Sequence, residues 1–598
     1  MDFIKARQRR VTVYKENAER TLAFLKNSRR IDELAAKSLF LNEGECLVPI
    51  GEIHRNDETL LERMKQWREE HADTFPTRFP VTREGTRNWL SSQVLDNPSR
   101  ILFLLTDPTF HALGHLGYAN VLNDEMSVEI DNVMRGVPNV RPGLMARAMI
   151  ALMEWVRIEL GPERIFLRVL ADNSRARRFY ERLGFSVEKE TPLFRHESGS
   201  TVSFLPHPAN EDQKPENAFI HMVYHRPAEK KISRPILTAG PSITGRELAY
   251  VSDAVRTGWN QNWAGYLNRF EQSFAEYIGV KYAIATSSCT GALHIALAAL
   301  HIGPGDEVII PEITWVATAN AVRYVGAIPI FADVEKNTWC LDPQSFQECI
   351  TPRTKAVIPV HLYGHPARME HIMDVADSHG IAVVEDAAPS IGAEYNGRRT
   401  GTFGDFSAFS FQGAKLAVTG EGGMLLTDEE SLFNKAHKIW DQGRVPGTFW
   451  IDSDGVKYKM SNIQAALGLA QLERVSFLVT AKRRIHAWYE NNLSDIPYIS
   501  LFQEASWAYS IYWMVCIQLH DSAPLSRDGL MTALREKNID TRPVFPPISQ
   551  YPIWGKNSEP KPNANKIGQT GINLPSGVNL TQNEVEYVCQ AIRMVLKA

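Results

Sequence analysis

One lysine, Lys415, stands between an aromatic strand-like run and a glycine-rich turn. The run FSAFSF at 406–411 alternates small and aromatic residues, which predicts a half-buried strand. A lysine just past such a strand is partly removed from water, so its amine can be neutral and can attack an aldehyde. The glycines at 420–423 let the backbone approach a neighbour closely. Although most lone lysines are solvated, this setting predicts that Lys415 forms a Schiff base.

An acidic pair, Glu385 and Asp386, ends the apolar run at 381–386. Ligands of open α/β sheets bind at the carboxyl ends of strands. A buried aspartate in that position can keep the pyridine nitrogen of pyridoxal phosphate protonated, which makes the ring an electron sink. Taken alone, Asp386 could equally be a helix N-cap or a metal ligand.

A turn of small residues at 287–291 joins the strand-like run 282–286 to an alanine- and leucine-rich helix. The first N–H groups of a helix and its dipole both attract an anion. The turn is therefore a candidate phosphate site, although many α/β turns look similar.

These three segments, in this order, resemble the DegT-type nucleotide-sugar aminotransferases of aspartate-aminotransferase fold type I. The resemblance covers about 236–598 and includes the strings VHLYGHPARM and KYKMSNIQAALGLAQLERV. It implies an α/β fold with a large subdomain to about 480 and a small C-terminal subdomain. It also implies pyridoxal phosphate as cofactor, glutamate as amino donor and a keto sugar nucleotide as substrate. A dehydratase branch of the family has His in place of the lysine, so Lys415 favours transamination.

The resemblance implies a role for each matching residue. Lys415 is expected to form the Schiff base and to shuttle the proton, Asp386 to pair with the pyridine nitrogen, and Trp315 to stack on the ring. Phosphate contacts are expected from Ser410, Ser288, Cys289, Thr290 and Gly291. In the family, a residue of the other subunit completes the phosphate site, so a homodimer is expected. Lys457 stands where that residue is usually Asn and could bind phosphate as a cation.

The N-terminal half carries a second candidate anion site. The run 126–136 alternates as a strand, a loop with Arg141 and Gly143 follows, and 145–161 has the pattern of an amphipathic helix. A second strand at 164–173 leads into another helix, with Ser174 as a plausible N-cap. A strand, a basic glycine-bearing loop and a helix N-terminus together predict binding of a diphosphate group.

The string DNSRARRFYERLGF at 172–185 resembles the GNAT acetyltransferases, a resemblance that covers about 44–225. It implies a mixed sheet with helices and acetyl-CoA as cosubstrate. The expected pyrophosphate contacts are Arg141, Gly143 and Ala146, with the glycine one place from its usual position.

The GNAT resemblance also implies catalytic roles. Asn173 is expected to contact the pantetheine arm, and Tyr180 to protonate the leaving thiolate. Glu129 is the candidate base that deprotonates the incoming ammonium, although it could be an ordinary strand residue. Asp131 and His115 compete for the same role.

The length of 598 residues predicts roughly two to four domains. We expect a helical extension at 1–43, a GNAT-like domain at 44–225, a linker at 226–235 and the aminotransferase domain at 236–598. A net charge of -4 gives no reason to expect nucleic acid or membrane binding, and no apolar run is long enough to span a bilayer. Six scattered cysteines without a CxxC are typical of a reduced, cytoplasmic protein, and we expect no metal site.

An aminotransferase makes a primary amine, and a GNAT enzyme acylates one. Their fusion therefore predicts two consecutive steps on one sugar nucleotide. Two alternatives stay open: the keto substrate could be a cyclitol or an octulosonate, and the GNAT-like domain could be a binding or dimerisation module without activity.

Overall fold

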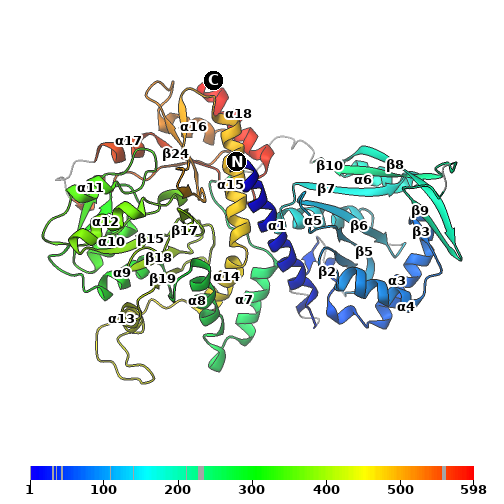
Figure 1. Ribbon diagram of the computed structural model, residues 1–598, viewed down its shortest axis with the longest axis horizontal. Helices are drawn as coiled ribbons and strands as arrows, with labels where there is room; N and C mark the ends of the chain where they lie inside the picture. The colour runs from blue at the N-terminus through cyan, green and yellow to red at the C-terminus, as the bar shows by residue number, and fades with distance from the viewer. Residues whose placement is uncertain are drawn as a thin grey trace. The chain divides into compact units, whose positions relative to one another are not determined.

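The computed structural model describes residues 2–29, 33–34, 37–41, 45–107, 110–138, 141–209, 212–225, 235–554 and 561–597. The chain divides into two compact units (Figure 1). The first consists of Met1–Glu229 with Thr244–Ala249, and the second of Lys230–Ile243 with Tyr250–Ala598. The linker predicted at 226–235 lies outside the described residues, apart from Pro235.

The first unit is built on a ten-stranded mixed sheet in the order β1-β2-β4-β5-β6-β7-β10-β8-β9-β3. Neighbouring strands are antiparallel, apart from the parallel pair β6 and β7. The strands are β1 (Leu39–Phe40), β2 (Cys46–Pro49), β3 (Thr77–Arg78), β4 (Ile101–Thr106), β5 (Ala112–Ala119), β6 (Ser127–Arg135), β7 (Arg164–Leu170), β8 (Phe185–Ser198), β9 (Thr201–Leu205) and β10 (Asn217–Tyr224).

The helices of the first unit pack on this sheet and form two cores. They are α1 (Asp2–Lys26), α3 (Glu58–Glu70), α4 (Arg83–Trp89), α5 (Leu144–Glu159) and α6 (Ser174–Arg182). Helix α5 begins after Gly143, whose φ of 78° favours glycine, and buries Ala148, Leu152 and Val156 along one stripe. Pairing between β6 and β7 ends at Ile130, although β6 continues for several residues, so the two strands diverge there.

The second unit has a seven-stranded sheet in the order β11-β19-β18-β15-β14-β12-β13. Strand β19 is antiparallel to both of its neighbours, and the other pairs are parallel. The strands are β11 (Tyr282–Thr286), β12 (Glu307–Pro311), β13 (Ile328–Ala332), β14 (Thr354–Val357), β15 (Ala382–Asp386), β18 (Phe406–Ser410) and β19 (Gly423–Thr427). The inner strands β12 and β15 are buried and rich in valine and isoleucine, as expected for a sheet covered on both faces, whereas the edge strand β13 is more exposed.

Helices pack against the seven-stranded sheet, and a smaller antiparallel sheet forms a separate hydrophobic core. The helices are α7 (Gly245–Thr257), α8 (Gly265–Ile278), α9 (Cys289–Ala299), α10 (Ala317–Tyr324), α11 (Pro343–Glu348), α12 (Met369–His379), α13 (Glu430–Trp440) and α14 (Asn462–Leu472). The small antiparallel sheet has β20 (Ile499–Leu501), β22 (Val515–Leu519), β24 (Gly571–Leu574) and β23 (Arg542–Pro543), with α15 (Val475–Leu493), α16 (Arg527–Arg535), α17 (Pro562–Thr570) and α18 (Gln582–Leu596). A third sheet joins β17 (Arg398–Arg399), β16 (Glu394–Tyr395) and β21 (Ala508–Tyr509).

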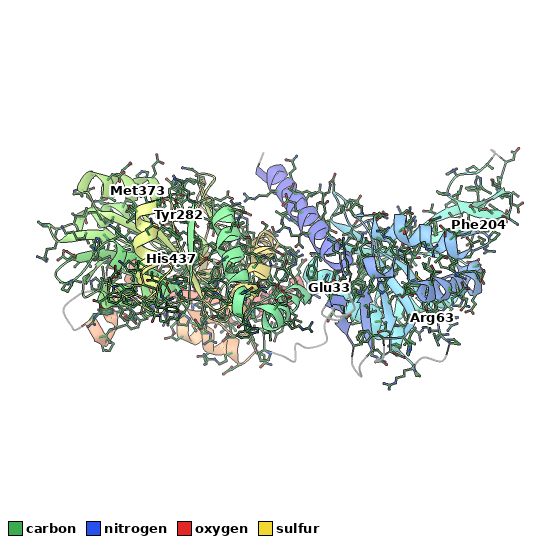
Figure 2. The ribbon with its side chains drawn as sticks, turned by 90° about the horizontal axis from the view of Figure 1, so that it is seen from below. Glu33, Arg63, Phe204, Tyr282, Met373 and His437 are labelled. Carbon is green, nitrogen blue, oxygen red and sulfur yellow. The ribbon has the colours of Figure 1, made fainter. Side chains whose placement is uncertain are left out.

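Side chains fill both units. Figure 2 labels Tyr282 of β11 and His437 of α13 in the second unit, and Arg63 and Phe204 in the first. Within the ranges that the structure describes, no helix is both long and apolar enough to cross a membrane.

Candidate active sites

Three strand ends of the seven-stranded sheet bring Cys289, Asp386 and Lys415 together. Asp386 ends β15, Lys415 follows β18, and Cys289 begins the helix after β11. The charges of Asp386 and Lys415 each change the pKa of the Cys289 thiol, and the pKa values of Asp386 and Lys415 also depend on each other. Three of the residues predicted from sequence therefore lie in one place.

Lys415 is half-buried, and its amine faces an aromatic ring. Its Nζ lies 3.9 Å from the ring centroid of Trp513, and Trp513 Nε1 donates to the carbonyl of Ala414 at 2.8 Å. Burial lowers the pKa of Lys415, and the negative charge of Asp386 partly opposes this effect. The amine is thus easier to deprotonate than an exposed lysine, as nucleophilic attack on an aldehyde requires.

Asp386 is buried, with only 5% of its surface exposed. Thr318 Oγ1 donates to its Oδ2 at 2.7 Å, and the Ala388 amide donates to its Oδ1 at 3.1 Å. Burial raises the pKa of Asp386, while the hydrogen bond from Thr318 favours the ionised form. The site therefore holds a fixed carboxylate of low solvation.

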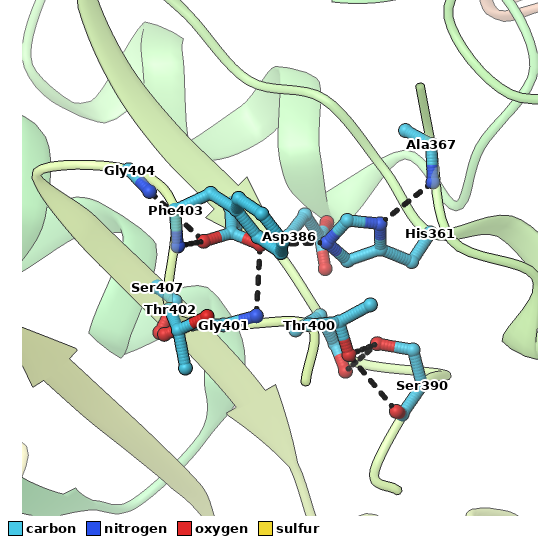
Figure 3. A network of polar contacts seen from close by, with 12 residues as sticks. His361, Ala367, Asp386, Ser390, Thr400, Gly401, Thr402, Phe403, Gly404 and Ser407 are labelled. Atoms are coloured by element: carbon cyan, nitrogen blue, oxygen red, sulfur yellow. Dashed lines mark hydrogen bonds and ion pairs between the residues drawn. The ribbon is translucent and has the colours of Figure 1, made fainter. Parts of the chain in front are cut away.

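The neighbouring Glu385 is buried and bonded within a polar network, and Figure 3 labels its partners His361, Gly401, Phe403 and Gly404. Its carboxylate accepts from His361 Nε2 at 2.9 Å and from three backbone amides, those of Gly401, Phe403 and Gly404. Although burial acts in the opposite direction, these donors lower the pKa of Glu385. The Ala367 amide donates to His361 Nδ1, so His361 is neutral with its proton on Nε2. The network fixes the end of β15 beside Asp386.

The predicted phosphate turn begins helix α9. Ser288 caps the helix, since its Oγ accepts from the Gly291 amide at 3.0 Å. Ser410 pairs with Gly423 across β18 and β19. A Cβ at Gly423 would lie 2.5 Å from the Cys289 nitrogen, so glycine is required where the two segments meet. Ser410 and the turn are therefore neighbours.

Trp315 and Lys457 differ from the residues above because both are exposed. Trp315 is 58% exposed, and its ring lies 5.8 Å from that of Phe545. Lys457 is exposed on a segment that runs beside the phosphate turn, where the Tyr458 carbonyl accepts from the Ser287 amide at 2.6 Å.

An aromatic group around Lys415 was not predicted from the sequence. Tyr363 stacks between Trp513 and Phe545, with centroid distances of 5.9 and 5.4 Å. It is buried and has a φ of 53°, an uncommon value for a tyrosine. Tyr363 belongs to the string VHLYGHPARM, one of the strings that carry the resemblance to the aminotransferase family.

The first unit places the predicted pyrophosphate loop at the start of α5. Gly143 precedes the helix and Ala146 lies in its first turn, while the side chain of Arg141 is 61% exposed. The buried carboxylate of Glu45 lies 3.8 Å from both Arg141 and Arg147. Asn173 caps α6, since its Oδ1 accepts from the Ala176 amide at 3.1 Å.

The acid–base candidates of the first unit separate into two groups. Glu129 is buried, and its carboxylate accepts from Arg168 Nε at 2.6 Å and Asn120 Nδ2 at 2.7 Å. Tyr180 is also buried. Burial raises its pKa most, and the negative charge of Asp131 raises it further.

The negative charge of Asp131 also acts on His115, so Asp131 is linked electrostatically to both Tyr180 and His115. Asp131 accepts from Asn132 Nδ2 at 2.7 Å and pairs with Arg100 at 3.1 Å. Burial lowers the pKa of His115 to about 4, against the opposing effect of Asp131. Because His115 Nδ1 contacts the Asn132 carbonyl at 2.8 Å, that nitrogen carries the proton and Nε2 is the acceptor.

Comparisons with known proteins identify both units. The acetyltransferase (GNAT) domain profile matches residues 50–186. The chain is 41% identical over 353 residues to a GDP-perosamine synthase of Escherichia coli O157:H7, which covers 59% of this chain and 96% of that protein. It is 40% identical over 369 residues to a GDP-perosamine synthase of Caulobacter vibrioides, which covers 60% of this chain and 98% of that protein.

A solved structure of DesI in the presence of its TDP-sugar product aligns with a TM-score of 0.57 and 30% identity. The alignment covers 61% of this chain and 94% of DesI. These neighbours confirm the predicted α/β class, with fold type I in the second unit beside a GNAT domain. The DegT/DnrJ/EryC1/StrS profile matches residues 241–593, and the chain therefore belongs to this aminotransferase family and carries a GNAT acetyltransferase domain as well.

Proposed function

We propose that the chain aminates a keto deoxysugar nucleotide, with glutamate as donor, and then N-acetylates the new amine with acetyl-CoA. The first step is supported by Lys415 and the buried carboxylate of Asp386, whose charges act on each other. The similarity of the chain to a GDP-perosamine synthase supports it as well. The GNAT domain in the same chain supports the second step. The order follows from chemistry, because acetyl transfer needs the amine that transamination makes.

The residues of the second unit fit pyridoxal phosphate, the cofactor on which this aminotransferase family depends. The cofactor supplies an electron sink for the substrate carbon. Asp386 would hold a proton on the pyridine nitrogen, for which a buried, hydrogen-bonded carboxylate is suited. Lys415 would bind the cofactor covalently and move the proton at the substrate carbon. Trp315 would cover the ring.

The phosphate group fits the N-terminus of α9. The first N–H groups of a helix have no intrahelical acceptor, and here those of Cys289 and Thr290 would meet the phosphate, while Ser288 holds Gly291. Ser410 would add a hydroxyl donor from the adjacent strand end.

A homodimer with a shared site is part of the proposal. Lys457 is exposed, and the nearby segment carries Phe449, Trp450 and Ile451 at 94%, 73% and 50% exposure. Such a run of large apolar side chains is typical of a protein interface. Mixing Lys415→Ala with Lys457→Ala subunits should restore amination that neither variant shows alone. If the mixture stays inactive, Lys457 does not act across subunits.

For acetyl transfer, Arg141, Gly143, Ala146 and Asn173 would bind CoA, and Tyr180 would protonate the thiolate. Glu129 is the base predicted from sequence, but its carboxylate is committed to Arg168 and Asn120. Asp131 also has a partner, Arg100 at 3.1 Å, but its charge acts on both Tyr180 and His115, so Asp131 would accept the ammonium proton, directly or through water.

Turnover of the full chain tests both steps. GDP-linked and TDP-linked keto deoxysugars, a keto-cyclitol and a keto-octulosonate are each supplied with glutamate and pyridoxal phosphate. A sugar nucleotide should yield 2-oxoglutarate, and added acetyl-CoA should release one thiol for each amine formed. Amination of the cyclitol or octulosonate alone would overturn the substrate assignment. Amination without thiol release would leave the GNAT domain as a binding or dimerisation module.

A further inference from the structure

One face of the first unit's sheet combines basic and aromatic side chains. Strands β7, β10 and β8 lie side by side (Figure 1). Because successive residues of a strand point to opposite faces, Leu167 and Ile220 enter the core while their neighbours point the other way. We call this surface the basic–aromatic face; it consists of Arg164, Phe166, Arg168, Lys189, Phe219 and His221.

The nitrogen-bearing side chains Arg168, His221 and Lys189 form a row across the three strands, and Nε2 of His221 lies 2.9 Å from Thr191 Oγ1. His221 is directly opposite Arg168 on one side and Lys189 on the other. Arg168 and Lys189 are exposed, and His221 is partly exposed. Glu129 holds Arg168 through Nε, which leaves both terminal nitrogens of the guanidinium for a ligand. Lys189 makes no ion pair within the described part of the chain.

Two aromatic rings flank this row and also remain partly accessible. The guanidinium carbon of Arg168 lies 5.2 Å from the Phe219 ring centroid, and that of Arg164 lies 5.2 Å from the Phe166 centroid. Both rings are half-buried, so each leaves part of its face open to a planar ligand.

The cations of this face are partly neutralised, because Glu188 pairs with Arg164 and Glu129 pairs with Arg168, whereas Lys189 has no ion-pair partner in the described residues. The charges that act on His221 come from β8, with Lys189 and Glu188, and from β7, with Arg168 and Arg164. Burial lowers the pKa of His221 most, the three cations lower it further, and Glu188 alone opposes them. An anion placed here would meet Lys189 and the terminal nitrogens of Arg168.

We propose that the basic–aromatic face binds the nucleoside diphosphate of the nucleotide-linked amino sugar during acetyl transfer. The diphosphate would lie on Arg168, His221 and Lys189, and the base would stack on Phe166 or Phe219. The inference rests on the proposed function, since it assumes a nucleotide-linked amine as the acetyl acceptor. It adds that the GNAT domain recognises the nucleotide itself and not the sugar alone.

Photolabelling of the full chain with an azido-derivative of GDP tests this proposal. The chain is irradiated with saturating acetyl-CoA present, and labelled peptides are mapped by mass spectrometry. Label is expected within 164–170 or 217–224 and should be displaced by GDP. Lys189→Ala should reduce this label about tenfold, because it removes one charged hydrogen bond. Arg195→Ala, which removes an exposed cation elsewhere on β8, should leave it unchanged.

The remaining outcomes separate this inference from the proposed function. Label confined to 235–597 would overturn the inference and leave the aminotransferase proposal intact. The inference would also be overturned if acetyl-CoA displaced the label from the basic–aromatic face, because the probe would then occupy the CoA site. Displacement by pyrophosphate as readily as by GDP would overturn the stacking of the base. Phe219→Leu should weaken displacement by GDP but not by pyrophosphate.

Discussion

The amine of Lys415 lies 3.9 Å from the ring centroid of Trp513, although 97 residues of chain separate the two positions. The aromatic face stabilises the ammonium form by about 1 kcal/mol, against the burial that destabilises it. Trp513 is itself fixed, since the buried Lys482 donates to its carbonyl at 2.7 Å. Trp513 is therefore a positioning residue for the proposed Schiff-base lysine.

Replacement of Trp513 should change the protonation of Lys415. Trp513→Leu removes the ring and should lower the pKa of Lys415, so the apo protein should react faster with an amine reagent at the same pH. Trp513→Phe keeps an aromatic face and should react close to the wild-type rate. The measurement is the rate of Lys415 modification, followed by peptide mass spectrometry across pH. Equal rates for the Leu and Phe variants would show that the ring does not act on the amine.

The charge of Asp386 should matter more than its hydrogen bonds. Asp386→Asn removes the carboxylate that would hold the proton on the pyridine nitrogen, and kcat for amination should fall about a hundredfold or more. Thr318→Val keeps the charge and removes one donor, so the loss should be about tenfold. Steady-state kinetics with a keto sugar nucleotide give both values. Wild-type turnover in Asp386→Asn would refute the role of Asp386.

Glu385 should contribute stability that depends on pH. Its folded-state pKa is lowered, so its contribution is present above the usual carboxyl pKa and is lost as pH falls through the folded value. Glu385→Gln should therefore destabilise the second unit at neutral pH by about 3 kcal/mol, because it weakens the charged hydrogen bonds from the backbone amides. This difference from wild type should shrink in acid. Hydrogen exchange of the second unit against pH measures it.

A surface carboxylate provides the control for Glu385. Asp521 pairs with Lys566 but has an 82% exposed side chain, so Asp521→Asn should change stability by less than about 0.5 kcal/mol at every pH. If the difference in stability between Glu385→Gln and wild type does not vary with pH, the charge of Glu385 is not its cause.

The two acidic residues of β6 should behave differently in acetyl transfer. Asp131→Asn should lower kcat for thiol release about a hundredfold, because it removes the charge that acts on both Tyr180 and His115 and that would accept the ammonium proton. Glu129→Gln should mainly weaken the first unit through its lost pair with Arg168. Thiol release and thermal unfolding, measured on both variants, separate the effects. The opposite ranking of kcat would return the base role to Glu129.

The proximity of Lys415, Asp386 and Cys289 could be predicted from the sequence, because the carboxyl ends of parallel strands lie at one edge of a sheet. Each residue follows a recognisable apolar run, so its place at that edge needs no long-range information. Trp513 could not be found this way. It precedes an ordinary strand of the small sheet, and its contact with Lys415 depends on how that sheet packs.

Glu129 and Asp131 show a second limit of sequence patterns. Alternation places both side chains on the same face of β6. Their different partners depend on the pairing with β7, which includes Glu129 opposite Phe166 and ends at Ile130. No local signal in the sequence gives the residue at which two parallel strands diverge.

Borohydride reduction identifies the lysine that binds the cofactor. The full chain loaded with pyridoxal phosphate is reduced, digested and mapped by mass spectrometry. The pyridoxyl group should be found on Lys415. The rival is Lys482, a buried lysine whose pKa burial lowers to about 7 but whose amine is occupied by the carbonyls of Trp513 and Ser576. A pyridoxyl group on Lys482, or on no lysine, would contradict the assignment.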